Sequence, residues 1–191
     1  MKTALILIDF QKDYFSGGKH PLVDALEAAK NAYMLLQCFR EHNGYHVHTQ
    51  HISKEPGATF FISGDRGTDI HDSVAHFEGE PIVYKHTPSA FLNTELQALL
   101  EDQGIERLVI CGMTTHLAVD ATARAASDLG FQVIVAGDAC ATRDLQSGDT
   151  SIPADQVHKD ALAALKSYGK VMRSDEILAL LAAELDKNGA Y

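Results

Sequence analysis

The sequence predicts an α/β protein with three layers, in which a six-stranded parallel sheet carries helices on both faces. Short, almost wholly apolar runs alternate with longer segments whose apolar residues recur at helical spacing, and this alternation is repeated along the chain. The 191 residues are enough to bury a core of that size. We therefore expect one Rossmann-like domain spanning residues 1–191.

The first predicted strand is the run "ALILID" at 4–9, which is nearly all apolar and ends in an acid, as in a parallel strand covered on both faces. Apolar residues then recur at helical spacing from Leu22 to about Glu41, where "HNG" supplies a stop. Further strands are predicted in "YHVHTQHI", "PIVYK", "RLVICG", "FQVIVAGD" and "GKVMRS".

Helices are predicted in the intervals between these strands, near 93–103, at 116–129 and at about 153–167, with a last one in "DEILALLAAEL". Residues 53–79 fit no regular element. We expect them to form a long loop over the sheet edge, of the kind that serves as a lid or a substrate wall. No internal repeat or linker divides the chain.

The composition argues against several classes of function. A formal net charge of −10 and a pI near 5.3 disfavour nucleic acid and anionic membrane surfaces. Asp9 interrupts the first apolar run, which is too short for a signal peptide, and no run approaches the length of a membrane span. Three cysteines without CxxC spacing suit reduced thiols, so we expect a soluble cytoplasmic protein without disulfides.

Candidate site residues follow the predicted strands, because ligands of parallel sheets bind at the carboxyl ends of strands near the switch in strand order. These candidates are Asp9, His48 to His51, Lys85, the corner "GMTTH" and Asp138. Asp9 and Lys85 together could keep a carboxylate ionised and shuttle a proton. Taken singly, each equally suits a strand-end cap or a surface charge.

Three stretches resemble the signature sequences of the isochorismatase-like cysteine hydrolases: "LILIDFQKDYF", "VYKHTPSAF" and "LVICGMTTHLAVDATARAASDLGF". With the spacing between them, the resemblance covers almost the whole chain. It implies a six-stranded parallel sheet and a catalytic triad, in which the acid matches Asp9 and the lysine matches Lys85. The nucleophilic cysteine of the family matches Ala118, which carries only a methyl group.

Three interpretations of Ala118 stay open. In the first, which we take as the prediction, the natural residue is Cys, and this copy is an inactive or impaired variant of a hydrolase for a carbon–nitrogen bond in a small molecule. In the second, the chain resembles isochorismatases, which keep the Asp and Lys, have a small residue here and hydrolyse a vinyl ether. In the third, it is a binding protein without catalysis.

The resemblance also implies roles in the amide reaction. Asp9 would take the thiol proton and pass it to the leaving amine, while Lys85 holds Asp9 and favours the thiolate. Backbone N–H groups of Thr114 and Ala118 would meet the oxyanion, next to a cis peptide between Met113 and Thr114. Other cysteines would not replace the thiol, since Cys111 is predicted inside a strand and Cys140 beyond the end of another.

No metal or other cofactor is expected. Related nicotinamidases bind a metal through a sequence resembling T-Q-D-W-H, whereas this chain has "TQHIS", with His51 and Ser53 at the two ligand positions. We expect the substrate, a small amide-type molecule, to contact residues in a partly apolar crevice, namely Gln11, His51, Phe91 and His116. Relatives are commonly dimers or tetramers, so we also expect a homo-oligomer.

Overall fold

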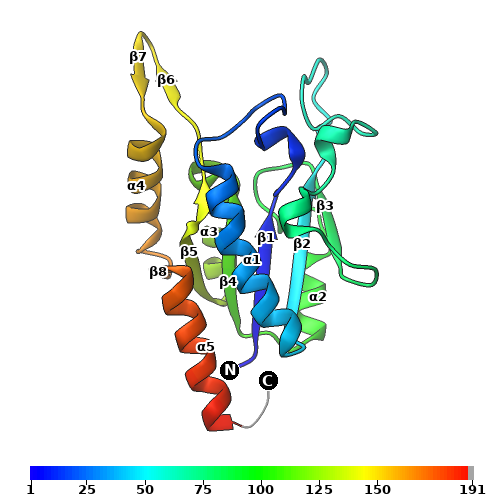
Figure 1. Cartoon of the computed structure of the whole chain (residues 1–191), viewed down its shortest axis with the longest axis vertical. Coiled ribbons are helices and arrows are strands. Elements are labelled where there is room, and N and C mark those ends of the chain that lie inside the picture. Colours follow the sequence, from blue (N-terminus) through cyan, green and yellow to red (C-terminus); the bar gives the residue numbers. More distant parts are fainter. Residues whose placement is uncertain (189–191) are drawn as a thin grey trace.

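The computed structural model describes residues 1–188, with side chains through residue 184, and is built on one six-stranded sheet (Figure 1). All its neighbouring strands run parallel, in the order β3-β2-β1-β4-β5-β8. The strands are β1 (Thr3–Ile8), β2 (Tyr45–His51), β3 (Ile82–Lys85), β4 (Arg107–Met113), β5 (Gln132–Ala141) and β8 (Lys170–Met172). The predicted α/β fold with a six-stranded parallel sheet is confirmed.

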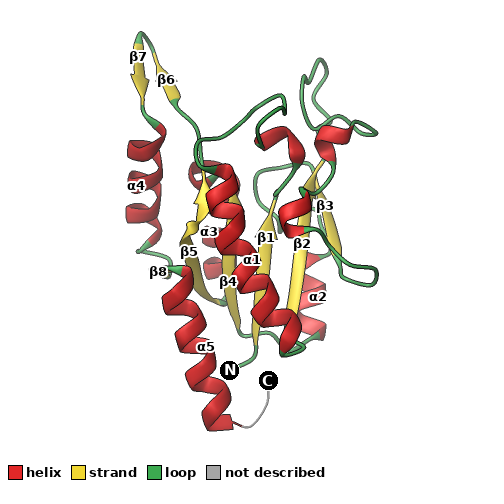
Figure 2. Ribbon diagram, viewed as in Figure 1, coloured by secondary structure: helices red, strands yellow, loops and turns green. Residues whose placement is uncertain are grey.

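Helices cover both faces of this sheet (Figure 2). One face packs against α1 (Ala25–Glu41) and α5 (Ser174–Asn188). The other face packs against α2 (Leu96–Asp102), α3 (Asp120–Asp128) and α4 (Ala154–Leu165). No described helix is both long and apolar enough to cross a membrane.

Strand β1 lies at the centre of the sheet and shows why its sequence is apolar at every position. Leu5 and Leu7 belong to the core beneath α1 and α5, whereas Ala4, Ile6 and Ile8 belong to the core on the opposite face. All five side chains are 1% exposed or less. A strand buried on both faces cannot alternate apolar with polar residues, because both sets of side chains face a core.

Two predicted elements have different bounds in the structure. Helix α1 begins at Ala25 instead of Leu22, because Val23 forms a β-bridge with Thr142 and Asp24 adopts φ 57°. Strand β5 continues to Ala141, past the expected end at Asp138. Its extra residues pair with Gly112 and Met113 of β4, so the two strands reach the same edge of the sheet.

Two short strands were not predicted. β6 (Leu145–Ser147) and β7 (Thr150–Ile152) form an antiparallel hairpin that projects from the body of the protein (Figure 1). Residues 53–79 form an irregular segment with two 3₁₀ turns, η2 (Arg66–Thr68) and η3 (Asp72–Val74). A third turn, η1 (Lys12–Tyr14), follows β1. The hairpin, η1 and η2 lie beyond the carboxyl ends of the strands, where the site is built, whereas the segment after η3 returns to the end of α1, where the Ala75 carbonyl accepts from Arg40.

Gly112 allows the two central strands to approach closely. It adopts φ 140°, and a Cβ atom placed on it would lie 2.2 Å from the carbonyl oxygen of Ile8. That contact is with backbone, which cannot move aside without breaking the β1–β4 pairing. Glycine at this position is therefore a requirement of the sheet.

We expect Gly112→Ala to lower the free energy of unfolding by about 3 kcal/mol or more, since backbone strain and overpacking add. Gly57→Ala is the matched control. Gly57 also has a positive φ, 80°, but nothing lies within 4 Å of its Cβ position, so about 1 kcal/mol is expected. Urea unfolding of both variants measures the difference, and equal losses would contradict the close approach.

Candidate active site

Asp9 follows β1 at the point where the strand order reverses, with β2 on one side and β4 on the other. Its backbone adopts φ 49°, a left-handed conformation that Asp tolerates better than most residues. Thr49 of β2 fixes the side chain in two ways. Its hydroxyl donates to Asp9 Oδ1 at 2.6 Å and accepts from the Asp9 backbone N–H at 3.1 Å.

Lys85, the last residue of β3, completes a buried ion pair with Asp9. Its Nζ lies 2.6 Å from Asp9 Oδ2, and the two side chains are 0% and 2% exposed. The ammonium also donates to the carbonyl oxygens of Thr87 at 3.0 Å and Pro88 at 3.3 Å. Each charge is thus matched by a partner and by hydrogen bonds, as burial requires.

The corner after β4 brings Ala118 to the same edge of the sheet. The peptide bond between Met113 and Thr114 is cis, and Thr115–Val119 form a single π-helical turn before α3 begins. The Thr115 hydroxyl anchors this turn by donating to the Ala141 carbonyl at 3.2 Å. Ala118 is 5% exposed and packs with the apolar core on the α2 and α3 side.

Thr114 carries a hydroxyl that is buried and has no hydrogen-bond partner within the described part of the chain. A buried hydroxyl without a partner costs free energy of the order of 1–3 kcal/mol. Such a group at a strand-end corner is suited to a ligand, because a substrate oxygen or a water molecule could accept its proton.

His51 and His116 both lie half-buried at this edge. His51 Nδ1 is 3.3 Å from Lys85 Nζ, and burial lowers the pKa of this imidazole. His116 Nδ1 is 2.5 Å from the Thr142 hydroxyl, and its pKa is also lowered, first by burial and then by the charge of Arg143. Both rings therefore favour the neutral form, in which one nitrogen can accept and the other can donate.

Gln11 and Phe91 are placed differently from the other predicted contacts. The Gln11 amide is fully buried and hydrogen-bonds to backbone groups. Its oxygen accepts from the His51 N–H, and its nitrogen donates to the carbonyls of His51 and Thr68. The Phe91 ring stacks on Phe131, with centroids 6.0 Å apart, and packs on the α2 and α3 side. These placements favour structural roles for both residues.

Sequence reasoning missed Arg143 at this edge. Arg143 follows β5, is half-buried and donates from Nη1 to His20 Nδ1 at 3.0 Å. Burial raises the pKa of the Tyr14 hydroxyl, with the charge of Asp9 adding to this effect and the charge of Arg143 opposing it. Tyr14 thus lies within the electric field of both groups. Arg143 was not predicted at this edge because β5 continues beyond its predicted end, to Ala141.

The three cysteines of the described chain form no disulfide bond. Cys111 lies inside β4 as predicted, but Cys140 lies inside β5, not beyond a strand end, because that strand continues to Ala141. Burial raises the pKa of both thiols, to about 12 for Cys140. Neither provides a thiolate at neutral pH.

No three His, Cys, Asp or Glu side chains gather to hold a metal ion among the residues that the structure describes. His46 and His48 instead face Glu80, which binds Arg40 through both carboxylate oxygens at 2.7 and 2.8 Å. This cluster fastens residue 80 to α1, because Arg40 is the penultimate residue of that helix.

The buried acid–lysine pair lies at the switch point of a doubly wound α/β sheet. Parallel sheets bind small molecules at this place, outside the carboxyl ends of their strands. Residues 3–176 match the Isochorismatase domain. The chain belongs to the isochorismatase family.

Several relatives span nearly the whole chain. The uncharacterised isochorismatase family protein YddQ of Bacillus subtilis is 42% identical over 92% of this chain and 98% of its own. The secreted isochorismatase effector Isc1 of Verticillium dahliae is 35% identical over 92% and 90%. A solved structure of an isochorismatase-type protein from Oleispira antarctica has a TM-score of 0.89 at 46% identity and covers 93% and 96%.

A relative with a different activity in its name is the maleamate amidohydrolase of Pseudomonas putida. It is 30% identical and the match covers 70% of both chains. The family therefore includes proteins named for different reactions, and the side chains of the site must distinguish between them.

Removing one member of the buried pair should lower the stability of the folded protein. We expect Lys85→Met to lower the free energy of unfolding by about 3 to 5 kcal/mol, because Asp9 is left buried without its cation. Adding Asp9→Asn should recover about half of this loss. Lys12→Met, in an exposed pair with Asp72, should cost less than about 1 kcal/mol. Urea unfolding gives all three values, and a Lys85→Met protein as stable as the parent would contradict this burial.

Proposed function

We propose that this protein is a small-molecule hydrolase in which the Asp9–Lys85 pair moves the proton. The observation that carries the proposal is the combination of a fully formed, buried acid–lysine pair with a methyl group at position 118. A chain without the thiol cannot form an acyl-enzyme at that corner. The reaction that the present side chains support best is hydrolysis of a vinyl ether, which needs no covalent nucleophile.

In this reaction a proton from the pair would be delivered to the terminal vinyl carbon, leaving an oxocarbenium ion at the ether carbon. Water adds to that carbon, and the hemiketal loses an alcohol to leave a ketone. The proton released by the attacking water would return to the Asp9 carboxylate and close the cycle, while the Lys85 ammonium, 2.6 Å away, would keep its proton and offset the carboxylate charge. The low dielectric around the pair strengthens its effect on the cationic intermediate.

Amide hydrolysis is the second candidate, and the maleamate amidohydrolase relative supports it. It requires a cysteine at position 118, with Asp9 as proton carrier and the N–H groups of Thr114 and the residue at 118 as oxyanion donors. Under this interpretation the present chain is an impaired variant. The pair and the corner would serve either reaction, so residue 118 would decide which bond is cleaved.

Arg143 supports an anionic substrate in both cases. It donates to His20 Nδ1, and its guanidinium has no carboxylate partner among the described side chains. Its charge lowers the pKa of both Tyr14 and His116, against the larger effect of burial at Tyr14 and together with burial at His116. A substrate carboxylate could bind this guanidinium in a bidentate manner.

The vinyl ether proposal predicts that the chain with Ala118 releases pyruvate from isochorismate. Asp9→Asn should reduce the rate about 10²-fold to 10⁴-fold, because the proton carrier is lost. Asp72→Asn, at an acid that is 87% exposed, should leave it unchanged. Coupled detection of pyruvate measures all three proteins, and no release by the parent protein would reject this reaction.

The amide proposal predicts that Ala118→Cys gains hydrolysis of maleamate or another small amide and loses it again when Asp9→Asn is added. The introduced thiol should react with iodoacetamide faster than Cys38, Cys111 or Cys140, since Lys85 and the helical corner favour a thiolate. Mass spectrometry locates the modified residue, and Ala118→Ser is the control without a thiol. A folded variant with neither property would reject a cysteine-hydrolase site.

A further inference from the structure

Tyr14 has a buried hydroxyl that makes no hydrogen bond within the described part of the chain. The residue ends η1, shortly after Asp9, and is 7% exposed. A buried hydroxyl without a partner lowers the stability of a protein, so such a group requires a physical reason. A ligand that accepts its hydrogen bond is one such reason.

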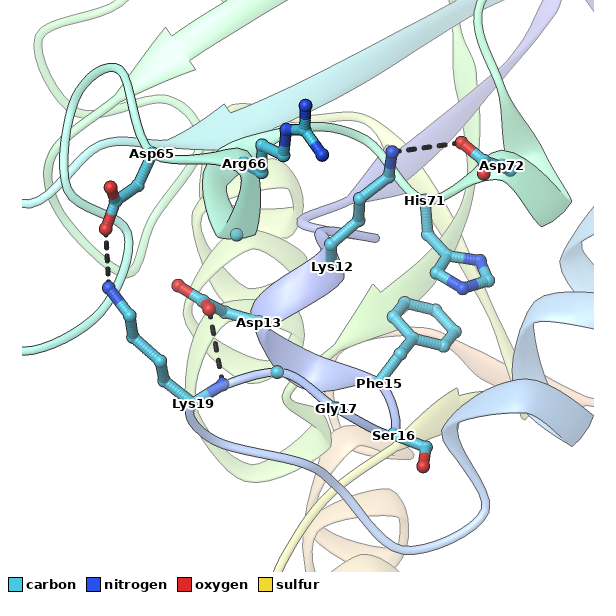
Figure 3. A pocket seen from close by; sticks show the side chains of 12 residues that line it. Lys12, Asp13, Phe15, Ser16, Gly17, Lys19, Asp65, Arg66, His71 and Asp72 are labelled. Carbon is cyan, nitrogen blue, oxygen red and sulfur yellow. Dashed lines mark hydrogen bonds and ion pairs between the residues drawn. The ribbon is translucent and has the colours of Figure 1, made fainter.

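The Tyr14 ring does not face the pocket beside η1. That pocket has a volume of about 660 Å³, and Asp13 and Phe15 line it, whereas Tyr14 does not (Figure 3). The Tyr14 ring instead packs edge-on against Phe61, with ring centroids 4.8 Å apart. The Phe61 ring in turn lies 5.7 Å from the ring of His51. Successive residues of this turn therefore serve two different places.

A row of aromatic rings connects the acid–lysine pair with Arg143. Its members, in order of contact, are His51, Phe61, Phe60 and His20. The first ring has its Nδ1 3.3 Å from Lys85 Nζ, and the last accepts from Arg143 Nη1 at 3.0 Å. Tyr14 packs against both phenylalanines of the row, at centroid separations of 4.8 and 6.4 Å. Its hydroxyl thus belongs to a wall that has a cation at each end.

The charges around Tyr14 decide how its hydroxyl can act. Burial raises the pKa of this phenol, the charge of Asp9 raises it further, and the charge of Arg143 opposes both. Coulomb interactions weaken with distance, so the hydroxyl lies near both charged groups. At neutral pH it keeps its proton, and it can donate a hydrogen bond but cannot serve as a base.

We propose that the Tyr14 hydroxyl donates a hydrogen bond to the substrate carboxylate that Arg143 binds, so that Tyr14 determines specificity for an acid. This inference rests on the anionic substrate of the proposed function. A carboxylate suits both donors, because its two oxygens offer about four lone-pair sites and can accept from a guanidinium and a phenol together. The aromatic row between the carboxylate and the acid–lysine pair suits a flat, unsaturated substrate.

The chemistry of a vinyl ether favours the carboxylate over the ether oxygen as the acceptor. The ether oxygen supplies electrons to the carbon that becomes cationic, and a hydrogen bond to that oxygen would withdraw them and slow the step. A hydrogen bond to the carboxylate leaves the ether unchanged and persists from the bound substrate to the transition state. Tyr14 should therefore affect KM and leave kcat nearly unchanged.

The first test measures binding without turnover, by titration calorimetry with benzoate and its neutral counterpart benzamide. The parent protein should bind benzoate more tightly than benzamide. Tyr14→Phe should reduce this preference about tenfold, because a hydrogen bond to a charged acceptor is stronger than one to a neutral acceptor. Tyr33→Phe is the matched control. It removes the hydroxyl of a tyrosine on α1 that is 46% exposed, and should leave the preference unchanged.

Thermal unfolding separates this role from a structural one. Tyr14→Phe keeps the ring and its packing and removes only a hydroxyl without a partner in the protein, so the midpoint should stay the same or rise. A lower midpoint with an unchanged preference for benzoate would assign the hydroxyl a structural role and overturn the proposal.

Kinetics distinguish this proposal from the reaction itself. With isochorismate as substrate, Tyr14→Phe should raise KM about tenfold with little change in kcat, and a fall in kcat at constant KM would overturn the carboxylate contact. A parent protein that releases no pyruvate would reject the vinyl ether reaction, but the benzoate titration needs no turnover and would still decide the role of Tyr14. A parent protein without a preference for benzoate, or a Tyr14→Phe protein that retains it in full, would overturn the proposal even where pyruvate is released.

Discussion

A carboxylate and an ammonium group held 2.6 Å apart, with almost no solvent contact, survive burial only because each has further hydrogen-bond partners. Three strands provide them. Asp9 comes from β1, Thr49 from β2, and Lys85 from β3, and the carbonyls beyond β3 accept the remaining protons of the ammonium. The site thus depends on the register of half the sheet, and displacing any one of these strands would leave a buried charge unmatched.

The same constraint shapes the surroundings of the pair. The Gln11 amide bonds to the end of β2 and to the Thr68 carbonyl, which ties that loop to the strand beside the pair. On the opposite side, Gly112 lets β4 approach β1, and the corner with Ala118 follows directly. The chemistry proposed for the pair requires this dry and rigid frame, because proton transfer between buried groups is sensitive to small changes of distance.

Position 118 separates the possible reactions more sharply than any other position of the site. Under the proposed function, the pair would deliver a proton whether or not a nucleophile is present, but only a thiol would hold an acyl group. Relatives named for an isochorismatase and for an amidohydrolase share this family. If the pair transfers a proton as proposed, a change of the residue at position 118 beside it would give that diversity a physical basis.

The sequence alone determined the α/β fold, the six strands and the placement of Asp9 and Lys85 at strand ends, because apolar periodicity and strand-end chemistry are local signals. It could not place Arg143 or the hairpin of β6 and β7, since the length of β5 depends on pairing with β4. Nor could it show that the Gln11 amide hydrogen-bonds to backbone groups or that Phe91 stacks on Phe131. Those contacts join residues about 40 positions apart, and only the folded chain decides which side chains meet.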